Sequence, residues 1–171
     1  MVNYLVIGAD LSKRYWKAVL DLMERFSITQ LALPIEPKYQ GEFDSMTAGS
    51  STVDDLAVLR VLEYDGAQVD ELKTLIARAV ERGITFWCIG DDSEEMVQVM
   101  GERLVSITGH VALLVTQDIA AKRQVGEQLP LGALLPDVET VCVQILVDAV
   151  PTQPLGTLLK AEQDFDYHYY A

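Results

Sequence analysis

Short apolar runs alternate along this chain with longer stretches of helical periodicity, and this alternation restricts the fold more than any other feature. The apolar runs span residues 2–7, 28–33, 84–89 and 111–115. Each has the length of a strand, and residues 2–7 have the continuous hydrophobicity of a strand that is buried on both faces of a parallel sheet. The pattern predicts a three-layer α/β fold, with a mainly parallel sheet of five to six strands of the Rossmann or flavodoxin type.

The stretches between these runs carry helical apolar stripes. In residues 13–26, Trp16, Leu20 and Met23 fall on one face, and residues 69–82 show the same spacing. Ser12 is a candidate N-cap for the first of these helices, and Gly83 is suited to end the second.

Two segments can be interpreted in more than one way. Residues 56–62 would suit either a central strand or a helix face, and we favour a strand because Asp65 and Gly66 follow as a turn. Residues 34–55 predict a long loop. The alternative is a short helix near Thr52, where Thr52 and Asp55 match a capping box.

The C-terminal third is less regular. Residues 120–129 predict a short helix, and the alternation over residues 141–147 predicts a sixth, half-exposed strand at an edge. We therefore expect a single α/β domain over residues 1–150, followed by an acidic aromatic tail over residues 151–171. The tail could dock on its own domain, on a second copy in a homo-oligomer, or on another protein.

The charge of the chain excludes some partners. The formal net charge is −13, from 26 acidic and 13 basic residues. Such a surface repels nucleic-acid backbones and anionic membranes, so we expect neither as a partner. The N-terminal residues lack the features of a secretion signal, and Cys88 and Cys142 lie in apolar runs as buried free thiols would. Both features favour a cytoplasmic protein.

Acidic residues follow several of the predicted strands. Asp10, Asp65, Asp91 and Asp118 each come shortly after an apolar run, with Glu63 as a weaker candidate. Ligands of open α/β sheets bind outside the carboxyl ends of the strands, so these side chains fall where a site would lie. Asp10 and Asp91 are the candidate ligands of a Mg²⁺ ion, the cofactor that carboxylate oxygens would favour.

Helix capping is a competing interpretation of these acids. Asp92 and Asp118 each precede a predicted helix, where a carboxylate accepts amide hydrogen bonds and meets the positive end of the helix dipole. Asp10, Asp65 and Asp91 therefore carry the site hypothesis.

Phosphate binding has a weaker basis. Gly8, Ser12 and Lys13 follow the first strand, but the further glycines of a dinucleotide fingerprint are absent. An anion could bind at the start of the following helix with help from Lys13. The candidate ligand-binding set is Gly8, Asp10, Ser12, Lys13, Asp65, Gly90 and Asp91.

The order of the predicted strands and their acidic ends resemble response-regulator receiver domains and other flavodoxin-like folds, over residues 1–128. The resemblance implies a phosphoacceptor aspartate after the third strand, but Arg60 and Glu63 lie there. Gly90 and Asp91 stand where the family has threonine or serine. Thr116 and Gln117 stand where it has lysine. The resemblance therefore implies a relative that is not phosphorylated.

Catalytic signatures are otherwise scarce. Ser50 and Ser51 lack the frame of a nucleophile elbow, and His110 is expected at the amino end of the sheet, opposite the acids. We therefore favour a non-catalytic binding or regulatory module that recognises a small ligand or a protein partner through the carboxyl edge of the sheet. The alternatives are a Mg²⁺-dependent enzyme acting on phosphate esters or nucleotides, and a nucleotide or phosphate-ligand sensor.

Overall fold

A computed structural model describes residues 2–124, 129–144, 154–161 and 164–171. The strands are β1 (Tyr4–Ala9), β2 (Gln30–Leu33), β3 (Thr85–Cys88), β4 (Val111–Thr116), β5 (Glu139–Gln144), β6 (Leu158–Lys160) and β7 (Tyr167–Tyr170). The α-helices are α1 (Trp16–Arg25), α2 (Gln40–Thr47), α3 (Ala57–Tyr64), α4 (Asp70–Glu81), α5 (Met96–Ser106), α6 (Gln117–Ala120) and α7 (Leu131–Leu134). Two short 3-10 helices, η1 (Pro37–Tyr39) and η2 (Val53–Asp55), complete the described elements.

The strands form one mostly parallel sheet in the order β3-β2-β4-β1-β5-β7-β6. β1 lies between β4 and β5 and pairs with both in parallel, Val6 opposite Leu113 on one side and Thr140 on the other. β6 and β7 form the antiparallel pair at one end of the sheet. The prediction of a mainly parallel α/β sheet is confirmed.

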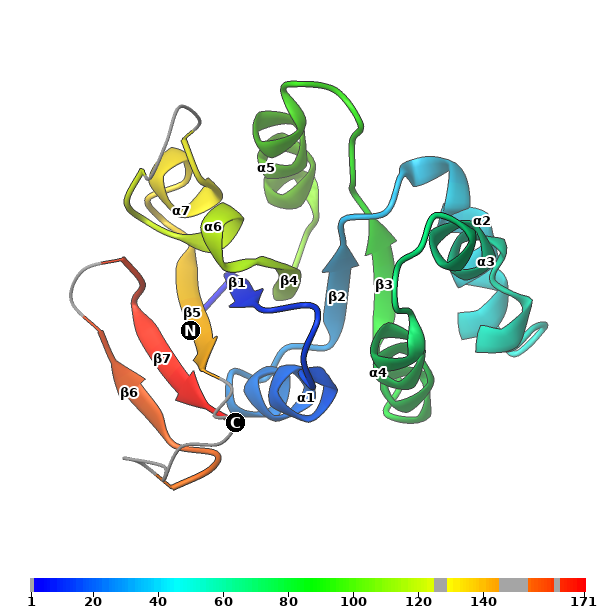
Figure 1. The fold of residues 1–171 in the computed structure, drawn as a ribbon, viewed down its shortest axis with the longest axis horizontal. Helices are drawn as coiled ribbons and strands as arrows, with labels where there is room; N and C mark the ends of the chain where they lie inside the picture. The colour runs from blue at the N-terminus through cyan, green and yellow to red at the C-terminus, as the bar shows by residue number, and fades with distance from the viewer. Residues whose placement is uncertain (1, 125–128, 145–153, 162–163) are drawn as a thin grey trace.

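Successive residues of each strand point to opposite faces, and the helices divide between these faces. Leu5 and Ile7 of β1 belong to one buried cluster, whereas Val6 belongs to another. Figure 1 shows α1 and α4 against one face of the sheet and α5, α6 and α7 against the other. The strands β1, β2 and β4 are therefore covered from both sides, whereas alternate residues of β3 are exposed.

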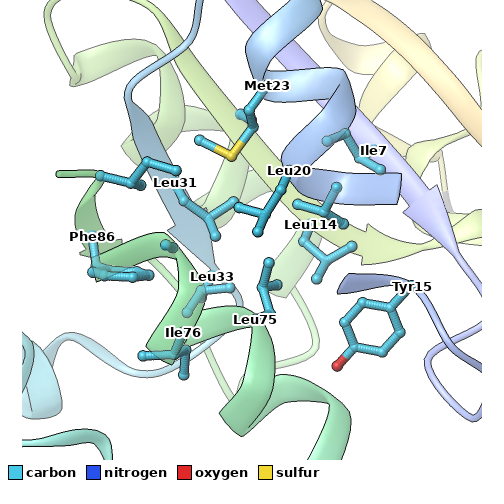
Figure 2. Packing of buried hydrophobic residues seen from close by; sticks show 14 of the residues in the cluster. Ile7, Tyr15, Leu20, Met23, Leu31, Leu33, Leu75, Ile76, Phe86 and Leu114 are labelled. Carbon is cyan, nitrogen blue, oxygen red and sulfur yellow. The ribbon is translucent and has the colours of Figure 1, made fainter. Parts of the chain in front are cut away.

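The larger cluster lies under α1 and α4. Leu20 and Met23 of α1 pack with Leu75 and Ile76 of α4 over the strand residues of β1, β2 and β4 (Figure 2). The apolar stripes predicted for residues 13–26 and 69–82 are confirmed as the buried faces of α1 and α4. Gly83 follows α4 with φ of 73°, as predicted for a residue that ends a helix.

The strand order departs from that of flavodoxin-like folds. Their common order is 2-1-3-4-5, whereas strands β1–β5 here run 3-2-4-1-5. The helices that follow the neighbouring strands β1 and β4 are α1 and α6, and they lie on opposite sides of the sheet (Figure 1). The resemblance to receiver domains therefore does not extend to strand connectivity.

The structure corrects two predictions in the first half of the chain. Residues 56–62, predicted as a strand, are instead the N-cap Leu56 and most of helix α3, because Val58 and Leu59 bury one face of a helix against the core. Residues 34–55 hold η1, α2 and η2 rather than a long loop. The capping box of Thr52 and Asp55 is confirmed, with the Thr52 amide donating to the Asp55 carboxylate over 2.8 Å.

The C-terminal residues also differ from expectation. β5 lies inside the sheet between β1 and β7 instead of at an edge, and its central residues are buried because α6 and β7 flank it. Residues 145–147, the rest of that predicted strand, lie outside the described residues. The helix predicted over residues 120–129 is not found in residues 121–124, since α6 ends at Ala120; residues 125–128 lie outside the described residues. The residues predicted as a tail supply β6 and β7.

At the β3 edge of the sheet, a side chain binds the free backbone groups of the strand. Gln40 of α2 donates to the Phe86 carbonyl over 2.9 Å and accepts from the Cys88 amide over 2.7 Å. These are the hydrogen bonds that a neighbouring strand would make, so Gln40 covers the free edge of β3. Within the described ranges, no helix has both the length and the apolar character needed to cross a bilayer.

Candidate functional site

A cleft of about 380 Å³ opens at the carboxyl ends of β1 and β2. One wall is the loop from β1 to α1, and the other is the connection from α3 to α4. The side chains around it are mostly apolar: Leu11, Ser12, Tyr15, Leu33, Pro34, Ile35, Leu62, Ala67, Gln68, Val69, Leu72 and Leu114. The cleft therefore lies at the edge where the sequence predicted a site, but acids do not line it.

The second wall owes its shape to a tight helix ending. Asp65 is the C-cap of α3, and Gly66 follows with φ of 91°, a conformation that favours glycine. The amides of Gly66 and Ala67 then donate to the Glu63 and Leu62 carbonyls, over 3.0 and 2.9 Å. This turn reverses the chain within five residues, so that the α3–α4 connection faces the β1–α1 loop.

Glu71 joins the two walls. Its carboxylate Oε1 accepts the amides of Tyr15, over 2.7 Å, and Trp16, over 3.0 Å. These amides belong to the first turn of α1, which has no cap from its own residues. Ser12, predicted as the cap, instead donates its hydroxyl to Asp10, so the prediction for Ser12 is wrong. An anion binding at this helix start would have to displace Glu71.

Tyr15 forms the floor of the cleft beside Leu114. Only 4% of its surface is exposed, and Figure 2 shows its ring at the margin of the core cluster. Burial raises the pKa of Tyr15, and the nearby Glu71 carboxylate adds to the rise, so the hydroxyl stays protonated. In the described part of the chain this hydroxyl has no hydrogen-bond partner.

Asp10 is held within its own loop. Its Oδ1 accepts from the Ser12 hydroxyl over 2.6 Å and from the Ser12 amide over 3.0 Å. These hydrogen bonds lower the pKa of the fully exposed Asp10 carboxyl, with a smaller contribution from Lys13. Asp91 repeats the arrangement, because it accepts from the hydroxyl and amide of Ser93, and its pKa is also lowered.

The strand order separates these two acids. β2 and β4 lie between β1 and β3, so Asp10 and Asp91 follow strands three spacings apart, about 14 Å. The structure does not bring them together. Across the described ranges, no three His, Cys, Asp or Glu side chains lie close enough to hold a metal ion.

The remaining predicted residues lie outside the cleft lining. A Cβ on Gly90 would come within 2.5 Å of the Pro34 carbonyl carbon, and one on Gly8 within 2.8 Å of the Ala120 Cβ. Both glycines therefore permit close backbone packing. Lys13 and Asp65 lie on the two loops that form the walls, next to lining residues.

The capping interpretation of Asp92 and Asp118 is also corrected. α5 begins at Met96 after Glu95, four residues beyond Asp92, so Asp92 does not cap it. Asp118 lies inside the first turn of α6, where Thr116 is the N-cap residue. It meets the dipole of that helix but accepts no capping hydrogen bond within the described residues.

The nucleophilic candidates are buried or bound elsewhere. Cys88 and Cys142 are free and buried, as predicted, and burial raises their pKa to about 12 and about 11. His110 contacts the Val2 carbonyl over 2.8 Å at the amino end of β4. His168 lies on β7 opposite Cys142 of β5, an arrangement that the sequence did not predict.

The cleft itself was missed by sequence reasoning. The apolar spacing predicts a strand that contains Leu62 and a helix that contains Leu72, with a turn before Ala67. None of these predictions indicates that the three residues lie opposite Tyr15. Gly66 was a usable signal, because a glycine directly after an apolar helix face marks a reversal. The contact of Glu71 with the first turn of α1, 55 residues away, had no local signal.

Comparison with known proteins finds similar folds but no related sequence. No protein-family model matches the chain, and no curated protein matches it in sequence. The type III effector HopBA1 superposes with a TM-score of 0.63 at 10% identity, covering 98% of this chain and 87% of that one. ChaN of Campylobacter jejuni, described for cofacial heme binding, gives the same TM-score and identity, with 98% and 86% covered.

A third structure, described under bacterial protein toxins, matches with a TM-score of 0.59 and 15% identity. It covers 84% of this chain, which spans 34% of that longer one. At identities this low, the matches show a shared fold alone. The chain has a mixed α/β fold, similar in architecture to an effector and to a heme-binding protein.

Proposed function

We propose that this chain is a non-catalytic ligand-binding module that takes up a small, mainly apolar molecule at the carboxyl edge of its sheet. We further infer that the sheet and the helices on its two faces form a three-layer, Rossmann- or flavodoxin-like core with a different strand order. The observation that carries the functional proposal is the apolar cleft between the β1–α1 loop and the α3–α4 connection.

The size and lining of the cleft favour a small molecule. Ligand pockets usually have volumes of about 300–1,000 Å³ and are lined by apolar side chains with a few polar groups. This cleft has about 380 Å³, and its polar lining side chains are Ser12, Tyr15 and Gln68. It also lies at the edge of the sheet where ligands of α/β folds bind.

The lining favours binding over chemistry. Among the described residues, none that lines the cleft is an aspartate, a glutamate, a histidine, a cysteine or a lysine. These are the usual general acids, bases and nucleophiles. Ser12 and Tyr15 carry the hydroxyls of the lining. That of Ser12 donates to Asp10, and the raised pKa of Tyr15 makes its hydroxyl a weak acid that stays protonated.

Ligand-dependent stabilisation tests the proposal. A thermal-shift panel of substituted naphthalenes, with heme added because a structural neighbour binds it, should contain compounds that raise the melting temperature. A ligand at a hundred times its Kd stabilises by about 2.7 kcal/mol. Calorimetry would then measure the Kd of the compounds that shift the melting temperature.

A pair of tryptophan variants locates the binding. Ala67→Trp places an indole in the cleft and should abolish the shift, whereas Ala48→Trp adds the same ring at an exposed position after α2 and should leave it intact. The proposal fails if no compound binds, or if Ala67→Trp binds as tightly as the parent. MgATP forms a separate arm, and binding of MgATP that Ala67→Trp does not affect would favour the enzyme or sensor alternatives.

A further inference from the structure

The chain buries two tyrosines against the same helix, and it uses their hydroxyls differently. Tyr15 is 4% exposed and Tyr169 is 5% exposed. The Tyr169 hydroxyl donates to the Asp21 carboxylate of α1 over 2.6 Å. The Tyr15 hydroxyl has no such partner within the described residues, although buried polar groups are nearly always hydrogen-bonded.

The free hydroxyl belongs to the cleft. Among the described residues, the fully buried side-chain oxygens without a partner are Glu42 Oε2 and Asp164 Oδ1. Tyr15 Oη is not one of them, so it keeps contact with solvent, and the space that Tyr15 lines is the cleft. This hydroxyl is therefore open to a hydrogen-bond partner that enters the cleft.

The carboxylate of Glu71 binds the backbone of Tyr15. Glu71 uses its Oε1 for the amides of Tyr15 and Trp16, which also fixes the backbone that carries the phenol. Glu71 thus fixes the backbone of Tyr15, and the Tyr15 hydroxyl faces the apolar cleft. This is the arrangement of a positioned hydrogen-bond donor.

From this geometry we propose that Tyr15 donates a hydrogen bond to an uncharged acceptor oxygen of the ligand, a carbonyl or an ether on an otherwise apolar body. The inference rests on the proposed function and narrows its ligand class. A hydrocarbon that displaced water from the cleft would leave the hydroxyl unpaired, which is costly. A charged ligand group would lose its hydration among leucine and valine side chains.

Two probes of nearly equal shape test this class. 2-Acetylnaphthalene carries a carbonyl oxygen, and 2-isopropenylnaphthalene replaces it with a methylene group. Both affinities are measured on the full chain and on the variants Tyr15→Phe and Tyr169→Phe. The useful quantity is the ratio of the two affinities in each protein, because it removes the difference in hydrophobicity between the probes.

The ratio of ketone to alkene affinity should fall about fivefold in Tyr15→Phe, the equivalent of one neutral hydrogen bond. It should be unchanged in Tyr169→Phe, whose hydroxyl lies outside the cleft. Tyr15→Phe should also keep the melting temperature of the parent, whereas Tyr169→Phe should lower it because it loses the bond to Asp21.

Two results would overturn the inference while the proposed function stands: an unchanged affinity ratio in Tyr15→Phe, or a melting temperature as low as that of Tyr169→Phe. The second result would show that the Tyr15 hydroxyl has a structural partner. Failure of both probes and of the wider panel to bind the parent would instead remove the proposed function itself.

Discussion

The cleft and the β6–β7 hairpin each contain a buried tyrosine beside α1, but the two tyrosine hydroxyls differ in their hydrogen bonds. In the hairpin, Asp166 and Tyr169 have partners in other elements of the chain. In the cleft, the Tyr15 hydroxyl has no hydrogen-bond partner among the residues that the structure describes. A polar group with an internal partner stabilises the fold, whereas one left free at an apolar cleft is available to a ligand.

The hairpin is attached through Asp166, which contacts two other elements. Its Oδ1 lies 2.6 Å from Lys122 Nζ, and its Oδ2 accepts from the Thr140 amide over 2.8 Å. About a quarter of each charged side chain is exposed, so this pair is better shielded than the other ion pairs of the described residues. Asp166 therefore links β7 to β5 and to the residues after α6.

The largest effect is expected from Asp166→Ala. The change leaves the Lys122 ammonium and the Thr140 amide without their partner, so the free energy of unfolding should fall by about 2–3 kcal/mol. Urea denaturation followed by circular dichroism measures it. Asp137→Ala removes an exposed carboxylate and should stay within about 0.5 kcal/mol. Equal effects of the two changes would show that the hairpin contributes little to stability.

The next effect contrasts the two tyrosines directly. Tyr169→Phe should lower the free energy of unfolding by about 1.5 kcal/mol, since the lost hydrogen bond has a charged acceptor. Tyr15→Phe should change it by less than about 0.5 kcal/mol, because no internal bond is lost. The same denaturation assay suffices. A larger loss in Tyr15→Phe than in Tyr169→Phe would reverse the comparison.

A smaller effect is expected at the junction between the cleft walls. Glu71→Ala removes the cap of α1 and should cost about 1 kcal/mol, whereas Glu71→Gln keeps an acceptor oxygen and should cost roughly half as much. Thermal unfolding of both variants measures the difference. Identical losses would show that the charge of Glu71, and not its hydrogen bonds, matters.

The smallest effect concerns pH. Burial, together with the nearby Asp166, raises the pKa of Glu139 above its ordinary value of 4.5. The folded state therefore holds this proton at a higher pH than the unfolded state. This contribution to stability is full below pH 4.5 and is lost as the pH rises through the folded pKa.

Glu139→Gln removes this dependence. At pH 7 the variant should be more stable than the parent by a few tenths of a kcal/mol, and the advantage should vanish near pH 4. Urea unfolding at pH 4, 5.5 and 7 tests this. A parent whose stability relative to Glu139→Gln is constant over that range would contradict the raised pKa.

The sequence predicted the parts of the fold that depend on local periodicity. The strands β1 to β4 and the buried faces of α1 and α4 follow from apolar spacing, which neighbouring residues determine. The strand predicted for residues 56–62 was wrong because their dense Val and Leu suit a buried strand, while Leu56, Leu59 and Leu62 also suit a helix face. The side chains that face them across the fold decide such a segment, and these lie far away in the sequence.

The sequence predicted the location of the candidate site but not the set of residues that form it, because that set depends on contacts between distant residues. The carboxyl edge of the sheet is where the cleft lies, and Ser12 lines it. Asp10 and Asp91 were expected to act together, but the order β3-β2-β4-β1 puts the strands that they follow three spacings apart, about 14 Å. Strand order depends on how crossovers pack, which the local sequence does not report.

By itself, the sequence determined a parallel α/β sheet, a strongly acidic surface and two buried thiols, because each depends on composition or short-range spacing. The tertiary structure alone decided that Glu71 caps α1, that the C-terminal strands join the sheet and that Tyr15 faces an apolar cleft. These features join residues tens of positions apart, and a contact of that kind exists only after the chain has packed.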